Sequence, residues 1–205
     1  MKGKLHNVFP TLLYQAKDLQ AKKLNTQLLR EIQDIQQLDG AAQQWSKENY
    51  KNGFTSYGSG NRLHHFSSTF ERLEKQIDQH VKNFVSGLGY DLSGKRLKMN
   101  TCWVNVMNKN THHSLHLHPL SVISGTYYVQ VPRGASGIKF EDPRLAFLMA
   151  APPKKPKLKK EMQYFYEILP EAGSLVLFES WLRHEVPLHT QKTPRISISF
   201  NYDWG

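Results

Sequence analysis

The chain has 205 residues, of which 39% are hydrophobic and 11% aromatic, so its composition excludes a disordered protein and predicts one globular domain with a substantial core. Its single cysteine, Cys102, excludes an intramolecular disulfide and a zinc site built on several thiolates. The net charge of +10, from 27 basic and 17 acidic side chains, is compatible with solubility alone or with a polyanionic partner.

The sequence also bears on the compartment. A short apolar run lies within residues 1–18, but no small-residue cleavage site follows it, which argues against a secretory signal. No stretch approaches the ~18 consecutive apolar residues of a membrane span. With no disulfide-forming pair of cysteines, these features predict a soluble cytoplasmic protein.

The N-terminal region is predicted to begin with a strand and a helix. Residues 8–15 (VFPTLLYQ) have the composition of a short strand. From Asp18 to Leu38 apolar residues recur mostly at three- and four-residue steps, which predicts an amphipathic helix with Asp18 as its N-cap. The apolar positions are Leu19, Leu24, Leu28, Leu29, Ile32, Ile35 and Leu38.

A loop and a second helix are predicted next. Residues 40–65 are rich in Gly, Ser and Asn, and we expect them to form a long loop. Apolar residues with helical spacing then predict a helix at 68–87, ended by Gly87 or Gly89. The first 94 residues are therefore expected to support the rest of a single domain that spans residues 1–205.

After Gly94 the sequence changes to short segments of strand composition separated by turn residues. These segments are 96–107, 121–132, 137–142, 162–169, 173–178, 184–188 and 195–204. In the last one Ile196, Ile198 and Phe200 are predicted to face one side of a sheet. Arg195, Ser197, Ser199 and Asn201 are predicted to face the other side. Many short strands indicate a sandwich or barrel-like β fold, and the alternation does not distinguish a jelly roll from another barrel.

Residues 153–160 (PKKPKLKK) contain five lysines and two prolines. The prolines predict a loop. This loop is either a solvated surface insertion or a clamp for an acidic substrate.

Four histidines occur within residues 112–118, in the stretch HHSLHLHP. If Leu115–His118 is extended, His116 and His118 project from the same face and Leu117 points into the opposite layer. Such a pair suits a metal ion, although adjacent surface histidines are also common. His112 and His113 are expected to be loop residues at the rim of any pocket.

Two residues further along the chain favour the metal site. His184 begins a later predicted strand, 68 residues after His116. Arg195 opens the last strand and shares a face with Ser197. A buried arginine at this position needs an anion, ideally a carboxylate that it can bind through two parallel hydrogen bonds.

These residues resemble the iron(II)/2-oxoglutarate-dependent dioxygenases, and in particular a bacterial and phage branch of that superfamily. The resemblance covers residues 96–204, about half of the chain. The segments that carry it are WVN (103–105), HLHP (116–119), SGTYYV (124–129), FEDPR (140–144), FESWLRHEV (178–186) and RISISFN (195–201).

The resemblance implies a mainly β fold with flanking α, namely a double-stranded β-helix (a cupin-like jelly roll) formed by residues 95–205, with the N-terminal helices packed on it. It implies that His116, His118 and His184 hold Fe(II), and that Arg195 and Ser197 bind the distal carboxylate of 2-oxoglutarate. Asn105 and Tyr128 are further candidates for contacts with this cosubstrate. Dioxygen would be the second cosubstrate.

The chain departs from the pattern of the superfamily at two positions. His118 stands where most members have Asp or Glu, so three neutral imidazoles replace the usual two histidines and one carboxylate. Glu179 stands where relatives tend to have Pro. The first departure makes the site one unit more positive, which bears on iron affinity and on reactivity with oxygen.

Three functions are compatible with these observations. The first is an oxidoreductase that uses iron and 2-oxoglutarate to hydroxylate a protein, a nucleic acid or a small molecule. The second is a cupin-like three-histidine metal protein that does not use 2-oxoglutarate, and this reading leaves Arg195 without an anion. The third is a basic nucleic-acid-binding module, which leaves the spacing of the histidines and the arginine unexplained.

Overall fold

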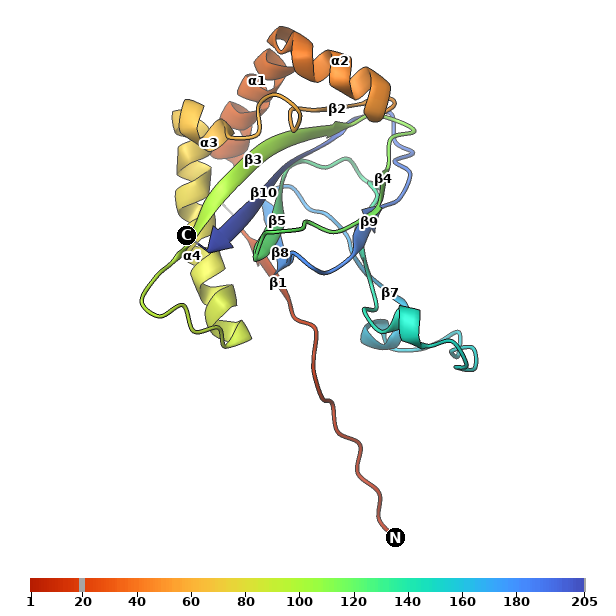
Figure 1. The fold of residues 1–205 in the computed structure, drawn as a ribbon. Helices are drawn as coiled ribbons and strands as arrows, with labels where there is room; N and C mark the ends of the chain where they lie inside the picture. Colours follow the sequence, from red (N-terminus) through yellow and green to blue (C-terminus); the bar gives the residue numbers. More distant parts are fainter. Residues whose placement is uncertain (19–20, 205) are drawn as a thin grey trace.

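Two antiparallel β-sheets form the centre of the computed structural model, which describes residues 1–18 and 21–204 (Figure 1). The larger sheet has the order β1 (Leu13–Lys17), β8 (Ser174–Glu179), β5 (Ile123–Gln130), β10 (Arg195–Trp204), β3 (Leu97–Met107) and β2 (Gly53–Thr55). The smaller sheet has the order β4 (His113–His116), β9 (His184–Val186), β6 (Ile138–Glu141) and β7 (Phe165–Ile168). This architecture confirms the mainly β jelly-roll class.

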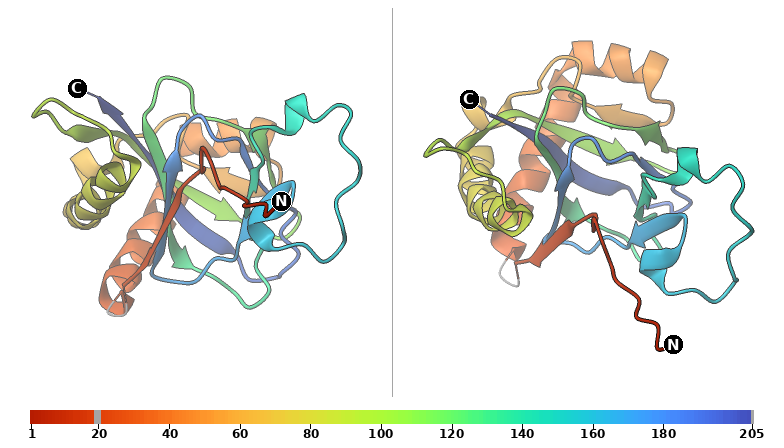
Figure 2. Two further views of the ribbon diagram at one scale, coloured as in Figure 1. Left: turned by 90° about the horizontal axis from the view of Figure 1, so that it is seen from below. Right: turned by 60° about the horizontal axis from the view of Figure 1, so that its bottom comes forward.

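Helices pack around the larger sheet. They are α1 (Lys22–Leu38), α2 (Gly40–Asn49), which contacts the edge strand β2, α3 (Leu63–Phe66) and α4 (Ser68–Leu88). Figure 2 shows α1 and α4 together on the side of the larger sheet that faces away from the smaller one. The long connection between β6 and β7 holds two 3-10 turns, Leu145–Phe147 and Lys160–Met162, and carries the lysines of residues 153–160.

The two faces of the larger sheet pack into different clusters. Ile196, Ile198 and Phe200 join the cluster that includes α1 and α4. Arg195, Ser197 and the other polar residues of the alternation face the smaller sheet instead. The period-two pattern of β10 therefore separates the helical core from the space between the sheets, as the sequence predicts.

The helix predicted at 68–87 is present as α4, at Ser68–Leu88. The Ser67 hydroxyl caps its first turn by accepting hydrogen bonds from the backbone N–H groups of Thr69 and Phe70. Gly89 ends it with φ +74°, a left-handed conformation that glycine adopts without strain. Of the two glycines predicted to end this helix, Gly87 and Gly89, it is Gly89 that ends it.

The first strand and helix begin later than predicted. The strand runs from Leu13 to Lys17 and not over 8–15. Asp18 is not the N-cap, because α1 begins at Lys22 and Ala21 precedes it. The backbone N–H of Asp18 donates to the carbonyl of Gly173 at 3.0 Å, so this residue still belongs to the β1–β8 pairing. Leu19, part of the predicted stripe, lies outside the described residues.

The prediction of a long loop over 40–65 was wrong, because this region contains α2, β2 and α3. The Asp39 carboxylate caps α2 by accepting from the backbone N–H of Ala42 at 2.9 Å. The body of the helix is built from Ala, Gln, Lys and Glu, which are strong helix formers. Strand β2 exists because it pairs with β3, a long-range contact that local composition does not reveal.

The N-terminal region is thus part of the β architecture as well as its support. Both β1 and β2 lie at edges of the larger sheet. Within the described ranges, no helix combines the length and the apolar character needed to cross a membrane.

Candidate active site

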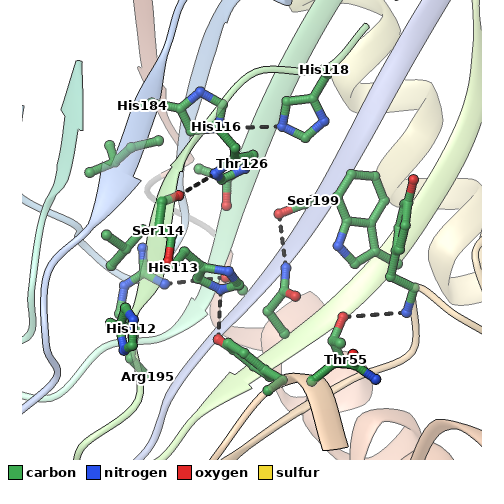
Figure 3. A pocket seen from close by; sticks show the side chains of 18 of the residues that line it. Thr55, His112, His113, Ser114, His116, His118, Thr126, His184, Arg195 and Ser199 are labelled. Carbon is green, nitrogen blue, oxygen red and sulfur yellow. Dashed lines mark hydrogen bonds between the residues drawn. The ribbon is translucent and has the colours of Figure 1, made fainter. Parts of the chain in front are cut away.

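A cleft of about 840 Å³ opens between the two sheets and is lined by residues from both of them and from α2. This volume is at the upper end of the range of small-molecule sites, which is about 300–1,000 Å³. Figure 3 shows His116, His118 and His184 gathered at one end of the cleft, with His113 and Arg195 at the other.

His116, His118 and His184 converge although they are far apart in sequence. His116 ends β4 and lies directly opposite His184, the first residue of β9. Their ligand atoms all lie within 4.8 Å of one another, and the Nε2 atoms of His118 and His184 are 3.3 Å apart. Two nitrogen ligands about 2.1 Å from one ion are separated by roughly 3.0–3.4 Å. Within residues 1–18 and 21–204, this is the one group of His, Cys, Asp or Glu side chains arranged to hold a metal.

Backbone carbonyls orient two of the three imidazoles. The Nδ1 atom of His116 lies 2.6 Å from the carbonyl oxygen of Ser114, and that of His184 lies 2.9 Å from the carbonyl oxygen of Leu182. A carbonyl only accepts, so Nδ1 carries the proton in each ring and Nε2 keeps its lone pair. Such a contact is the usual support for a metal-binding histidine.

Burial keeps two of the imidazoles neutral. Burial first, and the charge of neighbouring His116 second, lower the pKa of His184 to about 3 and that of His118 to about 4. Because the neutral imidazole is the form that binds a metal, the site can take an ion at neutral pH without first losing protons from these two residues.

The backbone around His118 differs from the expected extended strand. Strand β4 ends at His116, and the backbone N–H of His118 donates to the carbonyl of Ser180 at 2.9 Å. Leu117 does not point into an opposite layer, because it is 41% exposed and lines the cleft. Only His116 therefore lies in β4, and His118 joins it from the segment that follows the strand.

Arg195 is a buried cation at the inner end of the cleft. It is 2% exposed, and no carboxylate pairs with it among the residues that the structure describes. Its Nη1 lies 3.2 Å from the sulfur of Met107 and 3.4 Å from the hydroxyl oxygen of Ser197, while its Nε has no hydrogen-bond partner. The guanidinium lies over the ring of Tyr128 at 4.9 Å.

Other buried polar atoms near the arginine are also unmatched. Among the residues that the structure describes, the Tyr128 hydroxyl has no hydrogen-bond partner. Asn105 donates from its side-chain nitrogen to Ser199 at 3.0 Å, but its carbonyl oxygen has none. Buried polar groups are normally hydrogen-bonded, so the unmatched Arg195 Nε and Tyr128 hydroxyl are donors that a small acid could use, whereas the Asn105 carbonyl oxygen can only accept. Arg195, Ser197 and Asn105 line the cleft, whereas Tyr128 lies directly beneath the guanidinium.

Two residues of the site were not identified from the sequence. His113 was expected at the rim, but it lies inside the cleft on β4, and its Nε2 is 2.6 Å from the hydroxyl oxygen of Tyr50. The β4–β9 register shifts between His113 and His116, which directs both side chains inward. His112 is exposed, as expected. Tyr50 lay within the predicted loop, and no local pattern marked it.

Comparison with known proteins matches residues 101–201, about half of the chain, to a family described as "Putative 2OG-Fe(II) oxygenase". No curated protein matches the chain.

Solved structures share the fold at low identity. A prolyl-4-hydroxylase from Pseudomonas putida is 15% identical with a TM-score of 0.57, over 94% of this chain and 92% of that one. The epimerase SnoN, solved with Fe³⁺, alpha ketoglutarate and nogalamycin RO, is 11% identical with a TM-score of 0.64, over 94% and 79%. HygX from Streptomyces hygroscopicus, solved with nickel and 2-oxoglutarate, is 11% identical with a TM-score of 0.62, over 94% and 83%.

Proposed function

Because this chain belongs to the iron(II)- and 2-oxoglutarate-dependent oxygenases, we propose that His116, His118 and His184 bind its iron and that Arg195 binds the distal carboxylate of 2-oxoglutarate. The observation that carries this proposal is the pairing, in one cleft, of three converging imidazoles with a buried arginine that has no acidic partner among the described residues.

The donor set fits a ferrous ion. Neutral imidazole suits iron as well as zinc, copper and nickel, and His118 takes the place that a carboxylate has in the usual facial triad. His118 and His184 need no deprotonation at neutral pH, and the Ser114 and Leu182 carbonyls hold the other two rings in the ligating tautomer. The reducing cytoplasm predicted from the sequence would also keep the ion ferrous.

The polar groups around Arg195 fit the dicarboxylate. Its guanidinium offers a planar fork for two parallel hydrogen bonds. Ser197 lies on the same face of β10 and can donate a third, and the unmatched Tyr128 hydroxyl is a further donor. Asn105 could bind the acid only through its side-chain nitrogen, which donates to Ser199 in the ligand-free protein. The surrounding cluster, which includes Met107, Ile138 and Val186, excludes water and strengthens the ion pair.

Bound together, iron and 2-oxoglutarate supply the oxidising chemistry: 2-oxoglutarate is converted to succinate and carbon dioxide, and one oxygen atom of dioxygen enters the substrate. The residues of this chain orient the two groups, keep the inner cleft dry and leave its outer part for the substrate. No protein base or nucleophile is required, and we propose a hydroxylation.

The charges of the cleft bear on the class of substrate. Among the described residues that line it, the charged side chains are Glu48, Lys51 and Arg195, and the lysines of residues 153–160 lie elsewhere. Trp45, Tyr57 and Trp103 form an aromatic wall instead. These features favour a small molecule or a single side chain over a polyanionic chain, so the net charge of +10 serves solubility.

Succinate release tests the proposal directly. The protein, with iron(II), 2-oxoglutarate and dioxygen, is expected to release succinate, and the matched variants His184→Ala and Arg195→Met are expected to lose this activity. Binding of nickel(II) and 2-oxoglutarate, measured by calorimetry, separates the alternatives. A protein that binds nickel through the three histidines but does not bind 2-oxoglutarate would be the cupin-like metal protein instead.

A further inference from the structure

Tyr50 and His113 form a buried pair inside the same cleft as Arg195. The Tyr50 hydroxyl oxygen lies 2.6 Å from the Nε2 atom of His113, and the two ring centroids are 4.6 Å apart. Tyr50 is 8% exposed and follows the last residue of α2, whereas His113 begins β4. The pair therefore joins a helix outside the jelly roll to the smaller sheet.

The local sequence is built around the Tyr50 ring. The backbone N–H of Tyr50 donates to the Ser46 carbonyl at 2.7 Å, and the N–H of Gly53 donates to the Tyr50 carbonyl at 3.0 Å. A Cβ atom on Gly53 would lie 2.4 Å from the Tyr50 ring and 2.9 Å from a methyl carbon of Thr111. Only glycine therefore leaves room for the ring at this turn, which holds the phenol in one place.

Both members of the pair line the same cleft as Arg195. Figure 3 shows His113 next to Arg195, at the opposite end of the cleft from His118. Burial lowers the pKa of His113 to about 3, and the positive charge of Arg195 is the next cause. Burial raises the pKa of Tyr50, and the Arg195 charge opposes that rise. At neutral pH the pair is thus a neutral phenol and a neutral imidazole beside a cation.

A carboxylate bound by Arg195 would need more donors than the arginine provides. Its two oxygens accept about four hydrogen bonds, and a buried charge pair is favourable only if these sites are satisfied. The arginine fork fills two of them and Ser197 can fill a third. Tyr50 lines the same cleft and offers a hydroxyl beside His113 of the smaller sheet, so it is a candidate for the fourth donor.

We propose that Tyr50 is a positioning residue for 2-oxoglutarate, with its hydroxyl donating to the distal carboxylate that Arg195 holds. This inference rests on the proposed function. In the bound state the His113 tautomer with hydrogen on Nε2 donates to the phenol oxygen, so the phenol O–H is free to donate to the acid. His113 thereby fixes the direction in which Tyr50 donates.

The test compares two oxo acids on two proteins. Tyr50→Phe removes only the hydroxyl, and pyruvate is a 2-oxo acid that lacks the distal carboxylate. In calorimetry with nickel(II)-loaded protein, the variant is expected to bind 2-oxoglutarate about 10- to 100-fold more weakly, as for loss of a hydrogen bond to a charged group. Its affinity for pyruvate should stay unchanged. In turnover the KM for 2-oxoglutarate should rise, with kcat at saturation within about twofold.

Tyr14→Phe is the matched control. Its hydroxyl oxygen lies 2.9 Å from Nδ1 of His80, so this variant also breaks a tyrosine–histidine contact, but between β1 and α4 and outside the residues that line the cleft. It should bind both oxo acids as the wild type does.

Two results for Tyr50→Phe overturn the inference while leaving the proposed function intact. An affinity for 2-oxoglutarate equal to that of the wild type would show that the hydroxyl makes no contact with it. Equal losses for 2-oxoglutarate and pyruvate would instead show that Tyr50 shapes the cleft as a whole. If the nickel-loaded wild type binds no 2-oxoglutarate at all, the proposed function fails and this inference falls with it.

Discussion

Replacing Arg195 with methionine should weaken the binding of 2-oxoglutarate strongly, while the free energy of unfolding of the ligand-free protein stays the same or rises. Methionine has a similar length and no charge. The wild-type guanidinium is 2% exposed and, among the described residues, has no carboxylate partner, contacting instead the Met107 sulfur, the Ser197 hydroxyl and the Tyr128 ring. The cation is therefore costly for the empty protein and useful only when an anion is bound.

The size of each effect follows from these contacts. Removing one partner of a buried, hydrogen-bonded charge pair costs about 2–5 kcal/mol, which corresponds to roughly 30- to 5,000-fold in the dissociation constant of 2-oxoglutarate. Folding of the ligand-free protein loses a cation–π contact worth about 2 kcal/mol when desolvated, but it also loses the burial of an uncompensated charge. The free energy of unfolding should therefore be unchanged within about 1 kcal/mol, or higher.

Calorimetry with 2-oxoglutarate on nickel(II)-loaded protein and urea unfolding of ligand-free protein measure the two effects. Arg144→Met serves as the control, because that arginine is exposed and pairs with Asp142 at 2.9 Å. It should alter neither quantity by more than about 1 kcal/mol. Unchanged affinity in Arg195→Met would refute the anchor, and a loss of several kcal/mol in unfolding free energy would mean that the arginine has a structural role.

Three further predictions concern the metal, the core and pH. His184→Ala should weaken nickel(II) binding by more than about 100-fold, since even changes to groups that support a ligand cost 10–100-fold. His118→Asp should keep the metal, because a carboxylate can replace the imidazole as a ligand. Calorimetry that finds wild-type nickel(II) affinity in His184→Ala would contradict the triad. Gly125→Ala should lower the free energy of unfolding by about 1–3 kcal/mol, because the added Cβ would lie 2.6 Å from the Phe200 ring. An unchanged urea midpoint would show that the ring moves aside without cost. Burial is the main cause that lowers the pKa of His64 to about 4, so below about pH 6.5 the unfolded chain binds more protons than the folded one. In urea unfolding of metal-free protein, the free energy of unfolding should therefore fall from pH 6.5 to 5, by up to about 1.4 kcal/mol per pH unit for this residue. A flat profile would exclude the effect.

Much of the architecture was predictable because it depends on short-range periodicity. The apolar stripe of α4 and the alternation of β10 each reflect one buried face, which the sequence displays directly. The three histidines and Arg195 could be identified because residue type and spacing survive in the sequence even when 68 residues separate two members of a site.

The remainder depended on contacts between distant segments. Gly53 indicates a loop by composition, yet it is required by the Tyr50 ring and lies in a strand that pairs with β3. Asp18 has the chemistry of an N-cap, but its backbone pairs beside β8 and the helix starts after it. The inward turn of His113 comes from a register shift that no alternation rule anticipates.

The division of the site between the two sheets has a mechanical consequence. All three imidazoles belong to β4, its following turn and β9, whereas Arg195, Ser197 and Asn105 belong to the opposite sheet. A dicarboxylate bound to the metal at one end and to Arg195 at the other would connect the two sheets. The doubly loaded protein should then open as a single unit, with slowed amide exchange in strands of both layers, while the ion alone would stiffen β4 and β9.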